Sequence, residues 1–434
     1  MTTTHGTRTI HLDAMARVEG ECGLRLEVRD GCLQDVHLDI YEPPRLFEAF
    51  LRGRSLHELP DITARICGIC PVAYQLTSVQ AIESALQIEP TLEIKALRRL
   101  LYCAEWIQSH ALHIYLLQAP DYFGMESATS LAELQPELVR QGLELKKVGN
   151  ELMRLMGGRS VHPISVCVGG FWKVPHGSAV REIRPRLEWA LQASVETARF
   201  VSSLSLPDFA TNSECVALSS PVEYAIDGGQ IVSSAGLNIA VPEFELAFLE
   251  EHVAHSTALH SVRSDRGSSY LVGPISRLNL NLKQLTPNAR QVAIESGISW
   301  PCYNPYAGIV ARAVELVQAC EECIQIIDSY REPDPPHIDY TIRAAEGCAA
   351  TEAPRGLLYH RYRIDGSGLV QSARIVSPTG QNCRRIEDDL RLLIPGILDR
   401  TDAEIVDACE KLVRSYDPCI SCSTHAVRCQ ITRH

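Results

Sequence analysis

The hydrophobic and polar positions of this chain change their period along its length. Near the amino end, residues 25–28 and 36–40 alternate apolar and polar side chains, and Asp30-Gly31 lies between the two runs. An alternation of period two predicts a half-buried strand, and Asp-Gly is a favoured pair in tight hairpin turns. We therefore predict that a small antiparallel sheet lies near the start of the chain.

From Pro71 onward, apolar residues recur every three or four positions, which is the pattern of helices with one buried face. Short breaks that contain Gly and Pro separate these segments, and there is no low-complexity linker between them. The periodicity predicts long helices over residues 91–118, 132–156, 179–206, 244–260 and 306–330.

Strand patterns return near the carboxyl end, at residues 357–364 and 369–376, and an amphipathic helix is predicted at 401–415. The fold class is therefore α+β and mainly helical, with a central bundle of long helices flanked by small β-sheets. We expect a single domain over residues 1–425. It has a β-rich amino segment (1–60), a helical core (71–332) and a carboxyl part of strands, a helix and a cysteine-bearing loop (340–425).

Composition and charge narrow the function. The chain has 434 residues, with 41 Lys and Arg against 53 Asp and Glu, and a formal net charge of −12. Nucleic-acid binding is not expected, because it requires clustered cations. No uncharged apolar stretch reaches the roughly 18 residues of a membrane span, and the first residues lack a secretory signal, so we expect a cytoplasmic protein. In that reducing compartment its 16 cysteines are free thiols or metal ligands.

Three C-x-x-C pairs occur in the sequence. Cys320 and Cys323 fall on the apolar stripe of a predicted helix, and we interpret them as core residues. The other two pairs are 67/70 and 419/422, and the Gly and Pro within or beside them favour tight loops. Two such loops can present four thiolates to zinc, an iron–sulfur cluster or a redox metal. The separation of about 350 residues disfavours a compact zinc ribbon.

Distinctive motifs surround these two pairs and recur along the chain. They are Arg17-Val-Glu-Gly20, Arg45-Leu-Phe-Glu48, Arg65-Ile-Cys-Gly-Ile-Cys70, His110-x-x-His113 with Asp121, Gly157-Gly-Arg-x-x-His-Pro163, Glu352-Ala-Pro-Arg-Gly356 and Asp417-Pro-Cys-x-x-Cys-x-x-His425. With these motifs the sequence resembles the large, catalytic subunit of nickel–iron hydrogenases, and the resemblance runs almost end to end. The motifs around the first cysteine pair and in the strand region are most similar to those of the cytoplasmic NAD(P)-linked bidirectional enzymes and sulfhydrogenase alpha subunits.

The resemblance implies that Cys67, Cys70, Cys419 and Cys422 all hold nickel. It also implies that Cys70 and Cys422 bridge to an iron that carries carbon monoxide and cyanide, a Ni-Fe(CO)(CN)2 centre. Thiolates are soft donors that suit such metals. Cys419 would accept the proton when H2 splits heterolytically, and Glu19 would relay that proton away.

By the same resemblance, Arg355, which follows Pro354, would lie above the metals and bond a cyanide, with Thr379 as a second donor. An always-charged planar guanidinium suits an anionic ligand. Asp121 and Asp417 resemble the carboxylates that hold this arginine, although Asp417 before a proline could equally be a turn or cap residue.

The resemblance further implies a structural metal near the carboxyl terminus. Glu48, His425 and the backbone carbonyl of Ile375 would bind Mg²⁺ or Fe²⁺, and the few protein ligands leave room for the waters that magnesium retains. In members of this family, a dedicated endopeptidase removes a carboxyl-terminal tail after nickel insertion, and the mature chain then ends at the position of His425. Residues 426–434 are therefore expected to be a cleavable tail, and the chain a precursor.

The chain has no Walker loop and no G-x-G-x-x-G after a strand, so we do not expect it to bind nicotinamide itself. The remaining cysteines are scattered and leave no set for a cluster. We expect an iron–sulfur small subunit, FAD- and NAD(P)-binding diaphorase subunits, and reversible oxidation of H2 to protons and electrons. Two alternatives remain. One is a hydrogen sensor or complex I-like scaffold, and the other a structural zinc protein, which would not need Glu19, Arg355 or His425.

Overall fold

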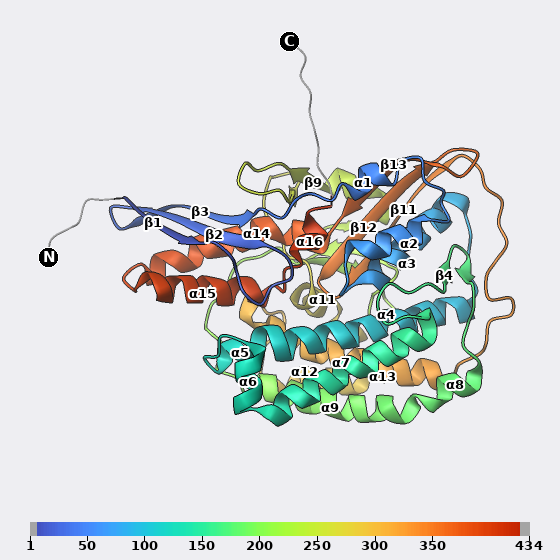
Figure 1. Ribbon diagram of the computed structural model, residues 1–434, viewed down its shortest axis with the longest axis horizontal. Helices are drawn as coiled ribbons and strands as arrows, with labels where there is room; N and C mark the ends of the chain where they lie inside the picture. Colours follow the sequence, from blue (N-terminus) through green and yellow to red (C-terminus); the bar gives the residue numbers. More distant parts are fainter. Residues whose placement is uncertain (1–6, 426–434) are drawn as a thin grey trace, which may run out of the picture.

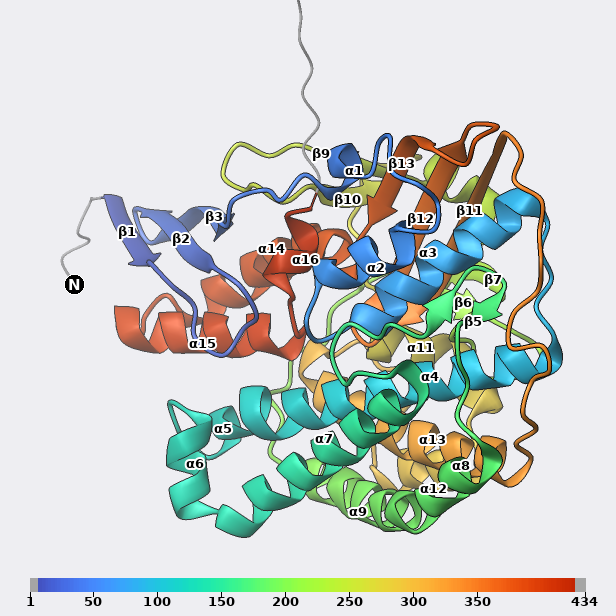
Figure 2. The ribbon, with the colours of Figure 1, turned by 45° about the vertical axis from the view of Figure 1, so that its right-hand side comes forward.

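Long helices form the middle of the molecule. A computed structural model describes residues 7–425, and Figures 1 and 2 show four of these helices stacked against one another. Most residues of one of them, α13 (Gly308–Asp328), are buried, so this helix runs through the core rather than over the surface. The four are α4 (Leu92–Leu112), α7 (Pro136–Gly157), α9 (Arg184–Ser202) and α13 (Gly308–Asp328).

Two antiparallel sheets flank this bundle (Figure 1). The amino-terminal sheet has the order β1 (Thr7–Leu12), β2 (Cys22–Arg29) and β3 (Cys32–Ile40). The second sheet has the order β11 (Ala345–Ala353), β12 (Gly356–Ile364) and β13 (Val370–Val376), and it packs against α3 (Pro71–Leu86). The mainly helical α+β fold that the sequence predicts is confirmed.

Smaller elements complete the chain. The short strands pair as β4 with β5, as β6, β7 and β8, and as β9 with β10. Their bounds are β4 (Val166–Cys167), β5 (Gly170–Phe171), β6 (Val216–Ser219), β7 (Gln230–Ser233), β8 (Asn238–Ile239), β9 (Phe248–Glu251) and β10 (His260–Arg263). The other α-helices are α1 (Phe47–Phe50), α2 (Leu59–Thr63), α5 (Ala119–Tyr122), α6 (Ala128–Leu134), α8 (Gly177–Glu182), α10 (Phe244–Ala247), α11 (Pro274–Asn281), α12 (Pro287–Glu295), α14 (Pro378–Leu393), α15 (Asp402–Ser415) and α16 (Ile420–Ser423).

Short segments of 3-10 helix and one of π-helix lie between or beside several α-helices. One π-helical segment, η2 (His113–Gln118), continues α4. Single turns of 3-10 helix are η1 (Ala64–Ile66), η3 (Val241–Glu243), η4 (Leu282–Gln284), η5 (Pro305–Ala307) and η6 (Ile394–Ile397).

The predicted helix over residues 244–260 is wrong. The segment contains only the short α10, and strand β9 follows at once. Phe248 and Glu250 are buried whereas Leu249 and Glu251 are exposed, so the local period is two rather than 3.6. β9 pairs with β10, and this tertiary pairing overrides the helical spacing of the apolar residues.

Other sequence expectations agree with the structure. The predicted core pair, Cys320 and Cys323, is fully buried in α13, where Cys320 Sγ lies 3.4 Å from the hydroxyl of Ser194. Among the helices that residues 7–425 form, none is both long and apolar enough to cross a bilayer. The expected tail, residues 426–434, lies outside the described residues.

Candidate metal centre

The first cysteine pair lies in the turn that leads into α3. Cys67 is extended after η1, and Cys70 is the residue before the helix, whose first position is Pro71. Proline suits that position because its missing N–H would be unpaired there anyway. The Glu105 carboxylate of α4 accepts the next two N–H groups, from Val72 at 2.6 Å and Ala73 at 3.1 Å. A buried side chain of the central bundle therefore fixes this cysteine loop.

The second cysteine pair lies in the segment that follows α15, here called the second cysteine loop: Cys419 immediately precedes the short helix α16, and Cys422 lies within it. Asp417 adopts a left-handed backbone conformation with φ of 56°, which turns the chain inward after α15. The N–H of Cys419 donates to the hydroxyl oxygen of Thr379 at 3.0 Å, and Thr379 lies in the first turn of α14. The predicted donor Thr379 thus anchors the backbone of this loop, and its hydroxyl hydrogen stays available to another acceptor.

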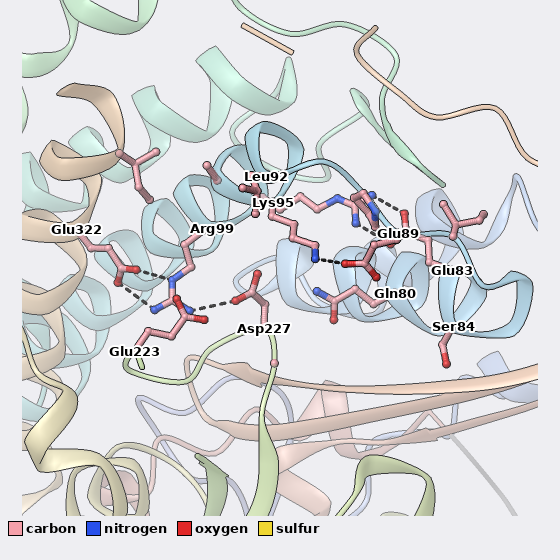
Figure 3. A pocket seen from close by; sticks show the side chains of 16 residues that line it. Gln80, Glu83, Ser84, Glu89, Leu92, Lys95, Arg99, Glu223, Asp227 and Glu322 are labelled. Atoms are coloured by element: carbon pink, nitrogen blue, oxygen red, sulfur yellow. Dashed lines mark hydrogen bonds and ion pairs between the residues drawn. The ribbon is translucent and has the colours of Figure 1, made fainter. Parts of the chain in front are cut away.

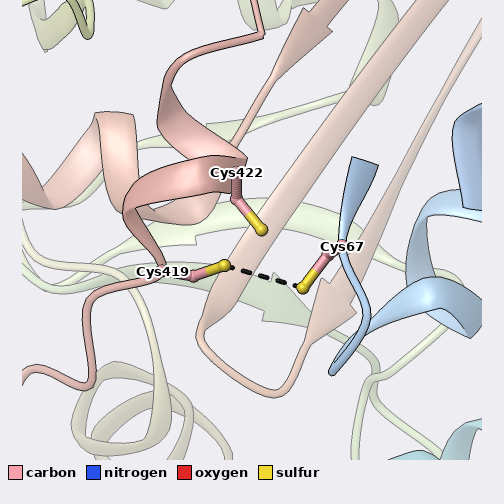
Figure 4. A group of neighbouring side chains, drawn as sticks. All are labelled: Cys67, Cys419 and Cys422. Atoms are coloured by element: carbon pink, nitrogen blue, oxygen red, sulfur yellow. Dashed lines mark hydrogen bonds between the residues drawn. The ribbon is translucent and has the colours of Figure 1, made fainter. Parts of the chain in front are cut away.

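The two loops bring their buried thiols together. Figure 4 shows three of them, Cys67, Cys419 and Cys422. Cys67 Sγ lies 3.6 Å from Cys419 Sγ, and Cys70 Sγ lies 3.8 Å from Cys422 Sγ. Thiolates bound tetrahedrally to one metal at 2.3 Å would have sulfurs about 3.8 Å apart. Both distances match that value, and the sulfurs of Cys67, Cys419 and Cys422 all lie within 4.8 Å of one another, so the cysteines have the donor chemistry of a thiolate-ligated metal site.

The four thiols do not ionise alike. Hydrogen bonds from Cys419 and the other site thiols hold the pKa of Cys67 well below its usual value. The N–H groups of Ile69 and Cys70 also donate to Cys67 Sγ, each at 3.3 Å. Burial raises the pKa of Cys419 and Cys422, since a charged sulfur is poorly solvated there. A cation at the centre of the cluster would favour the thiolate form of all four.

Glu19 lies beside the second loop. The thiol of Cys419 donates to Glu19 Oε2 at 3.0 Å, and the N–H of Ser421 donates to the same oxygen at 3.2 Å. The backbones also join, because the N–H of Ile420 donates to the carbonyl of Glu19 at 2.8 Å. Gly20 allows this approach: its φ is +87°, and a Cβ there would lie 2.7 Å from that of Ile420. Glu19 is only half-buried, so its carboxylate connects the thiol cluster with the outer part of the protein.

Arg355 lies in the turn between β11 and β12 and is 3% exposed. Its Nε donates to the backbone carbonyl of Asp417 at 2.9 Å, and its Nη2 donates to the Asp417 carboxylate at 3.1 Å. Burial opposes the charge of Arg355, but Asp417 and the thiolates of Cys419, Cys70 and Cys67 raise its pKa well above the usual value. Its Nη1 is buried and has no hydrogen-bond partner in the part of the chain that the structure describes. An anionic ligand near the thiols would satisfy it.

Asp121 does not hold Arg355, contrary to the sequence-based expectation. Its carboxylate binds Arg17 Nη2 at 2.5 Å and Arg414 at 2.9 and 3.0 Å. Arg17 lies in the segment that carries Glu19, and Arg414 lies at the end of α15. Asp121 therefore ties together the two chain segments that meet at Cys419, and Asp417 is the carboxylate that pairs with Arg355 among residues 7–425.

The residues expected to hold a second metal also lie together. The Glu48 carboxylate accepts the N–H of Ile375 at 2.8 Å, and His425 Nε2 lies 2.7 Å from the carbonyl oxygen of Ile375. His425 is 2% exposed, and its Nδ1 bonds the carbonyl of Cys422. One carboxylate, one imidazole and one carbonyl fit a hydrated hard cation. They also join the end of the second cysteine loop to β13.

Several buried residues near the centre were not singled out from the sequence. Arg277 donates to the carbonyls of Ala353 and Pro354, both at 2.9 Å, and so fixes the turn before Arg355. Glu315 pairs with Arg277 at 2.7 Å and lies 3.0 Å from His110. Arg277 and Glu105 contact segments far away in sequence, so no local pattern marks them. His110 is thus a buried packing residue with a polar partner.

A separate cavity of about 650 Å³ opens beside α3 and α4 (Figure 3). Arg99 bridges Glu322 at 2.6 Å and Asp227 at 3.0 Å within it, and Lys95 pairs with Glu89. The lining residues include none of the predicted site residues. The lining carries five carboxylates against three cations and no cysteine or histidine, so it offers neither a thiolate nor an imidazole to a metal.

The mainly helical α+β fold and the buried set of four thiols define a metalloprotein with a thiolate-bound centre. Over residues 45–142 and 307–425, the chain matches the nickel-dependent hydrogenase family. It is 33% identical to sulfhydrogenase 1 subunit alpha of Pyrococcus furiosus, over 96% of this chain and 98% of that protein. It is 26% identical to the beta subunit of the NAD-reducing hydrogenase HoxS of Cupriavidus necator, over 97% of this chain and 95% of that one.

Its fold also matches a crystal structure of an NAD⁺-reducing [NiFe]-hydrogenase, with a TM-score of 0.83 and 24% identity. That match covers 96% of this chain and 99% of the other. The chain belongs to the nickel-dependent hydrogenase family. It is a catalytic hydrogenase subunit of the nickel–iron type, so the structural zinc alternative is set aside.

Proposed function

We propose that Cys67, Cys70, Cys419 and Cys422 hold a nickel–iron centre at which H2 is oxidised reversibly to two protons and two electrons. When bound, the centre supplies the metals that polarise H2 and take up its electrons, with carbon monoxide and cyanide on the iron. Four convergent soft donors support this assignment. The unpartnered Nη1 of Arg355 would donate to a cyanide.

The proton path begins at Cys419. Its thiolate would take the proton released from H2, and Glu19 Oε2, 3.0 Å from that sulfur, would receive it next. The observation that carries the function is this pairing of a buried site thiol with a half-buried carboxylate. A site that only stored a metal would not need a carboxylate hydrogen-bonded to one of its sulfurs.

We also propose that Glu48, Ile375 and His425 bind Mg²⁺ or Fe²⁺ and so close the second cysteine loop. Electrons would leave through an iron–sulfur small subunit to FAD- and NAD(P)-binding subunits in the cytoplasm, since one relative is named an NAD-reducing hydrogenase. Nickel-insertion proteins and an endopeptidase that removes residues 426–434 would act on the chain before it is active.

The test is the metal content and activity of the protein isolated without oxygen together with its native partners. We expect nickel and iron in this subunit, and H2-dependent reduction of NAD(P) or a viologen dye. Nickel and iron without turnover would favour the hydrogen-sensing alternative. Zinc in place of both metals would overturn the proposal.

A further inference from the structure

A second cluster of metal-binding side chains lies away from the cysteines. It joins three parts of the chain: β3 supplies His37, the β9–β10 connection and the first residue of β10 supply His255 and His260, and α14 supplies Glu387. In Figure 2 the β9–β10 connection reaches toward β3 above α14, and the N–H of Thr257 donates to the carbonyl of Ile40 at 2.8 Å.

The side chains of this cluster are close enough to share one ion. The ligand atoms of His37, His255 and Glu387 all lie within 4.8 Å of one another. His255 Nε2 lies 2.7 Å from Glu387 Oε1, and the rings of His37 and His255 are 4.2 Å apart between centroids. His260 Nδ1 lies 4.0 Å from the second carboxylate oxygen, Glu387 Oε2. Two imidazoles and one carboxylate therefore converge, and the His260 ring lies beside the second carboxylate oxygen of Glu387.

Several atoms of this cluster are buried without a hydrogen-bond partner among the described residues. They are both ring nitrogens of His260, Nδ1 of His37 and Oε2 of Glu387. His260 and Glu387 are each only 1% exposed. Leaving a buried polar atom unpaired is unfavourable, so four of them at one place call for a ligand. Burial lowers the pKa of His260 to about 4, and the neutral ring has a lone pair to offer.

The surroundings also prepare His37 for a metal. Asp35 Oδ2 lies 3.1 Å from His37 Nε2, so the carboxylate holds the proton on that nitrogen and leaves the Nδ1 lone pair free. A carboxylate behind a histidine in this way is the usual outer partner of a metal-bound imidazole. The Arg391 guanidinium also lies near the cluster. It is 3.8 Å from Glu387 Oε2 and 3.3 Å from Asp35, so Glu387 and Asp35 share its charge.

We propose that His37, His255, His260 and Glu387 bind a divalent cation of the zinc class. Imidazole nitrogens and one carboxylate oxygen form the four-coordinate, closed donor set of a structural zinc site. The ion would clamp the amino-terminal sheet to α14. Since α14 begins beside Thr379, which anchors Cys419, the clamp would stabilise the layer on which the second cysteine loop rests.

The test uses the full chain in complex with its partners, with nickel and iron in place, after dialysis against a chelator and then against zinc. We expect one zinc per chain in addition to nickel and iron, measured by mass spectrometry of the metals. His37→Gln and His260→Gln should each weaken zinc binding more than 100-fold. Asp35→Asn should weaken it about 10–100-fold, the usual cost of losing an outer partner.

His11→Gln is the matched control, because His11 on β1 of the same sheet also pairs with an aspartate, Asp13 at 3.0 Å, but lies outside the cluster. It should keep the zinc. The His37 side chain is 19% exposed, so His37→Gln should fold even if substitution of the buried His260 prevents folding. Cobalt in place of zinc should give d–d absorption without a sulfur-to-cobalt band. No additional zinc, zinc unchanged in His37→Gln, or a sulfur-to-cobalt band would overturn the proposal.

Discussion

Replacing the Glu19 carboxylate by an amide tests the proton path most directly. Glu19→Gln keeps an oxygen that can accept from Ser421 N–H, 3.2 Å away, and it leaves the backbone bond to Ile420 unchanged. The loop should therefore keep its position. The amide cannot take a proton from Cys419, however, and the other partners of that sulfur among the described residues are site thiols, such as Cys67 at 3.6 Å.

The expected loss follows from this geometry. A positioned acid or base contributes about 10²–10⁴-fold to a rate, and its loss raises the barrier by about 3–5 kcal/mol. We expect H2 oxidation and the exchange of D2 with solvent protons to fall by that factor, with nickel and iron unchanged. Glu19→Asp keeps the carboxylic acid but shortens its reach by about 1.5 Å, so its rate should lie between those of the wild type and Glu19→Gln.

The assays are dye-linked H2 oxidation and D2 exchange by mass spectrometry, with metals counted in the same samples. Glu21→Gln is the control, because Glu21 is an exposed carboxylate two residues away, and it should retain wild-type rates. A Glu19→Gln enzyme with full nickel and iron that loses less than about tenfold in both assays would refute the relay, since that loss is below the range for a positioned base.

Three further predictions follow from the site. Cys67→Ser should abolish nickel binding and turnover, because a hydroxyl is a hard and poorly ionised donor; nickel per chain is the measurement, and full nickel would contradict it. Arg355→Lys should keep nickel but slow turnover about 10²-fold, since one ammonium cannot replace the planar donor set; retained wild-type turnover would count against the assigned role. Burial opposes the charge of Glu315, but Arg277 lowers its pKa from 4.5 to about 2. This pair contributes about 3 kcal/mol to the free energy of unfolding above pH 4.5, and that contribution is lost as pH falls toward 2. The free energy of unfolding, measured with urea at pH 7 and pH 3, should therefore change less in Glu315→Gln than in the wild type.

Local patterns predicted what depends on local interactions. The β2–β3 hairpin carries both the alternation and its Asp30-Gly31 turn, and α15 carries a capping box from Thr401 to Glu404. The paired cysteines were recognisable because Gly and Pro shape their loops. The segment 244–260 could not be predicted in this way, since its apolar spacing suits a helix and only the pairing of β9 with β10 selects a strand.

Side-chain contacts between residues far apart in the sequence could not be predicted from local patterns. Asp121 was expected to hold Arg355, but it binds Arg17 and Arg414, which are 104 and 293 residues away in sequence. The cluster around Glu387 likewise comes from three separate segments. A carboxylate selects among several arginines by geometry, and that geometry exists only after the helices and sheets have packed.

The amino- and carboxyl-terminal segments complete the metal centre together. The second cysteine loop forms backbone hydrogen bonds with residues from the first 50: Ile420 N–H with Glu19 O, Arg45 N–H with Thr424 O, and Phe47 N–H with His425 O, each at 2.8 Å. Contacts across nearly 400 residues form late, because closing so long a loop costs entropy before the contacts compensate for it. The central helices can therefore fold and place Cys67 and Cys70 first. The site then closes only when both outer segments reach it. Glu19 of the proposed proton relay and the proposed hard-cation ligands Glu48 and His425 all lie on these two segments.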